Sequence, residues 1–156
     1  MSRQMIITEI GVPRERAWEL LTDPKEFSFW APNVRDLELD PPKTFAVDTV
    51  RRFRLDVTGK IETLETQITH CTPPEMFAEI PIGGSMKIHE KVEQLKMIYR
   101  LETVDAKTCS LTFTMDYKMK GLMNQLLEQI IMGGFTSQLK LWFERLKTYA
   151  ETGRPV

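Results

Sequence analysis

The chain has 156 residues, 42% hydrophobic and 28% charged, which fits one globular domain with an ordinary core rather than a disordered chain. A formal net charge of −1 lacks the basic excess expected of a general nucleic-acid-binding protein. Cys71 and Cys109 lack metal-site spacing, and no apolar run is long enough to span a membrane. We therefore expect one domain over residues 1–156, without signal peptide, metal or other cofactor, in the cytoplasm with reduced thiols.

The first third of the chain predicts one strand and two short helices. Residues 3–11 are rich in β-branched side chains and end in glycine, which favours a strand. The segment "PRERAWELLTD" places its apolar residues on one helical side. Asp23-Pro24 then ends this helix and begins a second, "PKEFSFW", because Asp is a good N-cap and Pro suits the first helical turn.

The middle of the chain alternates with period two and predicts six strands. They cover residues 34–40, 49–57, 60–72, 75–82, 86–104 and 107–120. Within residues 86–104 the apolar positions change from even to odd numbers, which predicts a β-bulge near Glu93-Gln94. The alternative is a helical turn at "HEKVEQLK". One apolar and one polar face per strand is typical of an antiparallel sheet.

From Gly121 to about Ala150 the period returns to 3.6 and predicts one amphipathic helix, about 45 Å long. Gly133 and Gly134 interrupt it, although each should cost a helix interior about 1 kcal/mol relative to alanine. Two explanations stay open. The glycines either let the helix pack closely against the sheet, with a slight kink, or leave volume for a ligand.

These elements together predict an α+β fold. A curved antiparallel sheet of seven strands grips the long C-terminal helix, and the two short helices lie between strands one and two. Because twisted sheets curve, a straight helix touches such a sheet at the rims and leaves a space between.

Four segments also carry a resemblance to a known family: "EIGVPRERAWELLTDPKEFSFW", "THCTPPEMFAEI", "YRLETVDAKTCSLTFTMDY" and "LLEQIIMGGFTSQLKLWFERLKTYAE". Their order resembles the START-like helix-grip superfamily, in its polyketide cyclase/dehydrase and lipid-transport (SRPBCC) branch, over essentially the whole chain. The resemblance implies a cavity between sheet and long helix for a small hydrophobic ligand, such as a lipid or a polyketide-like molecule. It indicates the fold better than the function, because this fold hosts carriers, cyclases and receptors.

Strand parity and the helical arc predict which residues line this cavity, although each could instead be an ordinary core residue. Nine methionines favour an adaptable wall, because flexible thioethers fill irregular gaps. The predicted ligand-binding residues are Phe27, Trp30, Phe53, Leu55, Met76, Ala78, Met97, Tyr99, Phe113, Met115, Tyr117, Met123, Leu127, Ile131 and Phe135.

Three polar residues, Arg51, His70 and Glu90, share the predicted inward parity. In a cyclase or dehydratase, His70 or Glu90 would remove a proton next to a carbonyl and Arg51 would stabilise the enolate. The alternative is that all three lie near strand ends and reach water. The sequence thus supports three hypotheses: ligand binding or transport, a cyclase-like enzyme, or an interaction module whose groove binds a partner chain or a membrane surface.

Overall fold

The computed structural model describes residues 2–155 and confirms the predicted α+β architecture. Along the chain lie β1 (Ser2–Ile10), α1 (Arg14–Thr22), α2 (Pro24–Trp30), β2 (Val34–Asp40), β3 (Val50–Val57), β4 (Lys60–Thr72), β5 (Met76–Gly83), α3 (Ile88–Lys91), β6 (Val92–Asp105), β7 (Thr108–Met119), α4 (Gly121–Leu126) and α5 (Glu128–Thr152). All neighbouring strands pair antiparallel, in the order β1-β7-β6-β5-β4-β3-β2. The edge strands are therefore β1 and β2.

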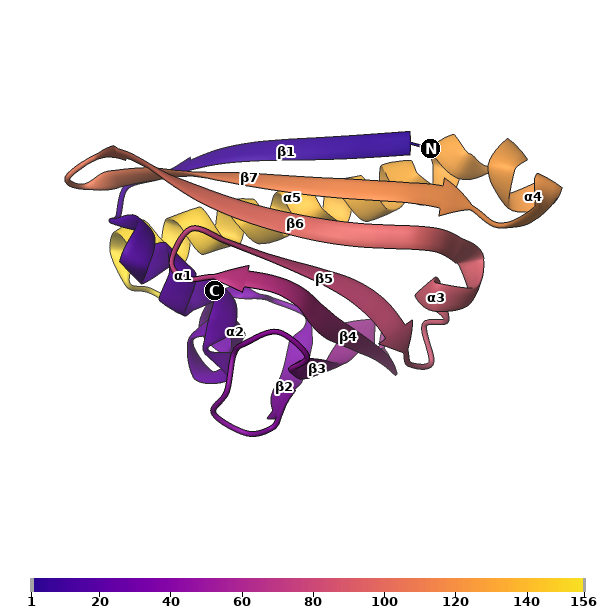
Figure 1. The fold of residues 1–156 in the computed structure, drawn as a ribbon, viewed down its shortest axis with the longest axis horizontal. Coiled ribbons are helices and arrows are strands. Elements are labelled where there is room, and N and C mark those ends of the chain that lie inside the picture. Colours follow the sequence, from indigo (N-terminus) through magenta and orange to yellow (C-terminus); the bar gives the residue numbers. More distant parts are fainter. Residues whose placement is uncertain (1, 156) are drawn as a thin grey trace.

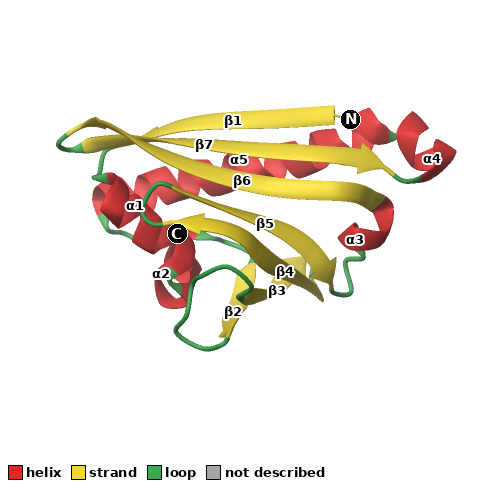
Figure 2. Cartoon of the chain, in the orientation of Figure 1, coloured by secondary structure: helices red, strands yellow, loops and turns green. Residues whose placement is uncertain are grey.

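The helices lie on one side of the curved sheet (Figure 1). The long helix α5 runs behind β1, β7 and β6, and α1 and α2 gather near its C-terminal end (Figure 2). At the opposite end of the sheet, α4 projects past the strands beside the N-terminus. Helices α1 and α2 thus lie near one end of α5, and α4 lies near the other (Figure 1).

The core forms from alternating side chains of the long strands. On β7 the predicted inward set from Cys109 to Met119 is buried, while the residues between them are not. Tyr99 of β6 stacks on Phe77 of β5 with ring centroids 4.3 Å apart. Phe113 of β7 lies 5.3 Å from Phe143 of α5 and so joins the sheet to the helix. The period-two prediction is confirmed for these strands.

The two short helices form as the sequence predicts. The Asp23 side chain accepts a hydrogen bond from the Lys25 backbone N–H, and Pro24 occupies the first helical turn of α2. The buried Trp30 indole Nε1–H then donates to the Leu20 carbonyl at 2.8 Å. This bond locks α2 against α1 and satisfies a donor that burial would otherwise leave unpaired.

A β-bulge in β4 overturns part of the predicted strand parity. The pairing with β5 shifts between Ile68 and His70, so that His70 lies opposite Ala78. One extra residue moves every later side chain to the other face. The predicted inward orientation is therefore wrong for His70, which is exposed, and for Met76 and Ala78, since Phe77 and Glu79 face the core instead.

In β6, by contrast, the predicted bulge is confirmed. The pairing with β7 shifts between Glu93 and Lys96, and Gln94 has a φ of 55°. The segment before it forms the helical turn α3, Ile88–Lys91, rather than a strand, so the alternative interpretation is confirmed for residues 89–91 and wrong from Val92 on, where β6 begins. Glu90 therefore lies on this turn with its side chain 60% exposed, so its predicted inward orientation is wrong.

The C-terminal helix is also divided, because Leu127 leaves helical geometry (φ −97°, ψ 6°) and separates α4 from α5. Leu122, Leu126 and Ile130 are more than 70% exposed. The predicted inward placement is wrong for Met123 and Leu127 too, which are 68% and 40% exposed. The physical reason is that β7 ends at Met119, so this part of the apolar arc lies beyond the strands (Figure 1).

Candidate functional site

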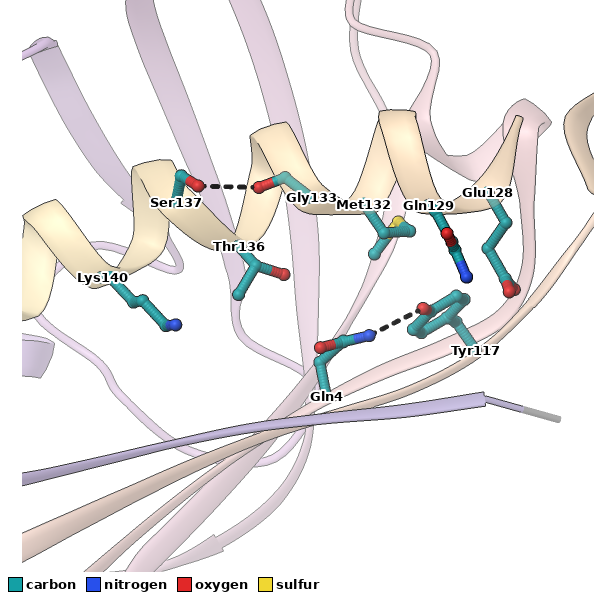
Figure 3. Close-up of a pocket in the computed structure, with 9 residues that line it drawn as sticks. All are labelled: Gln4, Tyr117, Glu128, Gln129, Met132, Gly133, Thr136, Ser137 and Lys140. Atoms are coloured by element: carbon teal, nitrogen blue, oxygen red, sulfur yellow. Dashed lines mark hydrogen bonds between the residues drawn. The ribbon is translucent and has the colours of Figure 1, made fainter.

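A pocket of about 350 Å³ lies between the β1–β7 edge of the sheet and the first half of α5. Its volume is near the lower end of the range for small-molecule sites, roughly 300–1,000 Å³. It is lined by Gln4, Tyr117, Glu128, Gln129, Met132, Gly133, Thr136, Ser137 and Lys140. Figure 3 shows Gln4 and Tyr117 pointing from the strands toward the helix.

The helical part of this lining follows one face of α5. Its residues recur at intervals of three and four from Glu128 to Lys140, which places them in one stripe. The stripe is mostly polar or small and therefore lies outside the apolar arc that the sequence predicts. Ile131 and Phe135, from the predicted wall, lie beside it and pack half-buried against the core. The polar stripe was visible in the sequence, but the same pattern is typical of a solvent-facing helix side.

The two glycines of α5 differ in their relation to the pocket. A Cβ added at Gly133 or Gly134 would meet no atom within 4 Å, so close helix–sheet packing is not what either position requires. Gly133 lines the pocket and Gly134 does not. The absent side chain at Gly133 therefore keeps pocket volume open, whereas no such consequence follows at Gly134.

Two hydroxyl groups at the pocket have hydrogen-bonding capacity to spare. The Tyr117 side chain is buried, and its oxygen accepts a bond from Gln4 Nε2 at 3.4 Å, which is long for such a bond. The Thr136 hydroxyl is buried and has no partner among residues 2–155. Buried polar atoms are nearly always bonded, so both groups suit a ligand oxygen or water.

A second, wider depression of about 680 Å³ lies away from α5, between the start of α2, β2 and the loop that follows β2. It is lined by Thr22, Asp23, Pro24, Lys25, Glu38, Leu39, Pro42, Lys43 and Phe45. None of these residues comes from the sheet–helix space in which the sequence placed a ligand.

Deeper in the core, Arg51 forms a buried ion pair with Glu79. Arg51 Nε and Nη2 donate to the Glu79 carboxylate at 2.9 and 2.8 Å, and Nη1 donates to the Leu21 carbonyl at 3.0 Å. The Thr66 and Tyr99 hydroxyls donate to the same carboxylate at 2.9 and 3.1 Å. The network thus joins four neighbouring strands, β3 to β6, with one residue from each, and ties them to the backbone of α1.

This network is electrostatically self-contained. Burial alone would lower the pKa of Arg51, but the charge and hydrogen bonds of Glu79 hold that pKa above its ordinary value. Burial and then Glu79 raise the pKa of Tyr99 well above its ordinary value, so its hydroxyl stays a donor. Four phenylalanine rings lie 5.0–5.7 Å from the guanidinium carbon, at Phe27, Phe45, Phe53 and Phe77. Such contacts favour a cation in an apolar setting.

The three predicted catalytic candidates are not brought together. Arg51 is buried with Glu79, while His70 is exposed and contacts the Thr69 hydroxyl at 3.0 Å. Glu90 lies on α3 beside His89. The proposed proton-transfer arrangement is therefore absent from this conformation. The sequence did not indicate Glu79 as the partner of Arg51, because most apolar residues of β5 lie at even positions, which assigned Glu79 to the outer face.

Most of the predicted wall instead packs as core. The members in the core are Phe27, Trp30, Phe53, Leu55, Met97, Tyr99, Phe113, Met115 and Tyr117. Ala78 is buried outside this cluster, and Met76 is half-buried. Of the predicted wall residues, Tyr117 lines the pocket. Met132, which was not predicted, is buried and also lines it.

Comparison with protein families gives a match over residues 7–151 to the model described as polyketide cyclase / dehydrase and lipid transport. The chain belongs to this family. A search of curated proteins finds no match. No helix within residues 2–155 has an apolar stretch sufficient to cross a bilayer.

Solved structures share the family fold. The Aha1 dimer of Colwellia psychrerythraea matches with a TM-score of 0.74 at 18% identity, covering 98% of both chains. The Zhui aromatase/cyclase of a Streptomyces species matches at 0.68 and 16%, covering 99% of both. A START superfamily protein of Mycobacterium smegmatis matches at 0.69 and 10%, covering 96% of this chain and 97% of that one. At these identities the likeness is one of fold.

Proposed function

We propose that this family member binds or transports a small hydrophobic molecule, lipid-like or polyketide-like, in the pocket between α5 and the β1–β7 edge. The observation that carries the proposal is this pocket, whose wall stays open because residue 133 is glycine. The family description and the helix-grip fold support it. Two free cysteines suit a cytoplasmic setting.

The lining indicates an amphipathic rather than a purely apolar ligand. Met132 and the Tyr117 ring offer apolar contact, and each CH₂ that a ligand buries contributes about 0.8 kcal/mol. The Tyr117 and Thr136 hydroxyls can also hydrogen-bond a ligand oxygen. The pocket should therefore bind a molecule with one polar group on a hydrocarbon skeleton more tightly than a pure hydrocarbon.

The two glycines provide a matched test. Gly133→Leu should fill the pocket, whereas Gly134→Leu adds the same side chain one residue away without lining it. We expect Gly133→Leu to weaken binding of a hydrophobic fluorophore about tenfold or more, and Gly134→Leu to leave it within about twofold. Native mass spectrometry of the purified protein should also reveal a co-purified small molecule. Equal affinities in both variants would overturn the assignment of this pocket.

A further inference from the structure

The edge strand β1 presents an unpaired side. It is nine residues long, its other side pairs with β7, and its outer rim lies open in Figure 1. On its outward face, Met5 and Ile7 are 51% and 66% exposed. Long edge strands with exposed apolar residues readily pair with another strand, and soluble proteins normally protect them.

The backbone groups that face this rim belong to the odd-numbered residues. The Glu9 carbonyl accepts a hydrogen bond from Lys147 Nζ at 2.9 Å, from which we infer that this carbonyl faces the rim and not β7. In an antiparallel strand, the N–H and C=O of one residue point to the same side, and successive residues alternate. Arg3, Met5 and Ile7 therefore direct their free N–H and C=O groups outward with Glu9.

The sequence of β1 is complementary to itself when read against its own reverse. With Ile6 opposite Ile6 of a second antiparallel copy, Arg3 lies opposite Glu9 and Met5 lies opposite Ile7. Both pairs join residues whose backbone groups face the rim, as hydrogen-bonded pairs require. A register shifted by two residues either way breaks the opposite-charge pair. We propose that a second copy of this chain binds here, β1 to β1, in a two-fold symmetric dimer.

The contacts already present at this edge leave room for such a partner. Arg3 uses Nε and Nη2 on Asp116, at 2.6 and 3.0 Å, which leaves Nη1 for Glu9 of the second copy. The Glu9 carbonyl can accept from the partner strand beside Lys147, since a carbonyl oxygen has two lone pairs. Pairing over Arg3 to Glu9 adds about eight backbone hydrogen bonds and two opposite-charge pairs across the two-fold axis.

The test uses the full chain in sedimentation velocity over a range of concentrations up to tens of micromolar. Glu9→Arg places two like charges opposite each other, and we expect dimerisation about tenfold weaker or worse. Met5→Pro removes an N–H that faces the rim and spares the β1–β7 ladder, so it should give a folded monomer. Glu102→Arg makes the same charge change on an exposed site of β6, away from the edge, and should dimerise like the wild type.

A wild-type protein that stays monomeric throughout this range would overturn the proposal, as would dimers that survive both Glu9→Arg and Met5→Pro. Concentration-dependent growth beyond two copies would also overturn it, because pairing of β1 with the other edge strand, β2, gives open chains instead of a closed pair. Pocket binding measured on the Met5→Pro monomer keeps this question separate from the proposed ligand.

Discussion

At the scale of single residues, the buried Arg51–Glu79 pair is held by hydrogen bonds from several elements. Replacing a complete buried ion pair by apolar groups can be neutral, whereas removing one partner leaves a charge in the core without compensation. Because Glu79 holds Arg51, Thr66 and Tyr99 together, it connects strands that are distant in sequence. We attribute a structural role to the pair, in fixing the relative positions of β3 to β6.

Glu79→Ala should therefore lower the free energy of unfolding by about 3–5 kcal/mol, because it leaves the Arg51 guanidinium buried in the core without a counter-charge. Urea denaturation measures this change. Thr66→Val, which removes one hydrogen bond to the same carboxylate, should cost only about 1 kcal/mol. If the double variant Arg51→Met/Glu79→Leu is no more stable than Glu79→Ala, the unpaired buried charge of Arg51 is not the cause of the lost stability.

Because Tyr99 is buried beside Glu79, we expect the free energy of unfolding to fall in alkaline solution. Burial and the Glu79 charge raise its pKa in the folded protein well above the ordinary value of 10.0. The folded state then holds this proton more tightly than the unfolded state, so the stabilisation is present below pH 10.0 and declines as the pH rises beyond it. In Tyr99→Phe the free energy of unfolding should fall less steeply above this pH. Parallel pH profiles for the two proteins would contradict the assignment.

At the scale of elements, the sequence predicted what local periodicity controls. The inward set of β7, the N-cap at Asp23 and the phase change near Gln94 all depend on residues close in the chain, and the structure confirms them. The bulge between Ile68 and His70 left no such mark, because Cys71 is the one apolar residue that follows it in β4, too few to reveal a change of phase. The Arg51–Glu79 pair was missed because the even-numbered apolar residues of β5 suggested the wrong inward face, and the polar pocket stripe resembled solvent-facing surface.

The glycines of α5 give a prediction about helix stability. Neither position needs the conformational freedom of glycine, and an added methyl meets open space at both. Gly134→Ala should raise the free energy of unfolding by about 0.5–1 kcal/mol through helix propensity alone. Thermal unfolding monitored by circular dichroism measures the shift. Gly133→Ala should stabilise the folded protein by the same amount and narrow the pocket slightly. A lower melting temperature in either variant would contradict this prediction and show that glycine is needed at that position for another reason.

At the scale of the whole molecule, α5 is fastened at its C-terminal half. The Trp142 indole donates to Asn33 Oδ1 at 2.8 Å, and the Tyr149 hydroxyl donates to Glu26 at 3.2 Å. Phe143, Leu146 and Tyr149 are buried in the same half. The N-terminal half of α5 has Met132 in the core but exposes Ile130, and α4 before it exposes its apolar residues, so fewer buried contacts hold this end.

This asymmetry predicts a gradient of amide hydrogen exchange along α5. Backbone amides in residues 141–149 should exchange close to the rate of global unfolding, and those in residues 128–133 should exchange faster through local opening. A ligand in the proposed pocket contacts the helix from Glu128 to Lys140, so it should slow exchange there and leave the C-terminal half unchanged. Gly133→Leu should abolish that ligand-dependent protection, and Gly134→Leu should retain it. Uniform protection along the ligand-free helix would contradict this prediction, because it would show that the N-terminal half of α5 is as stable as the C-terminal half.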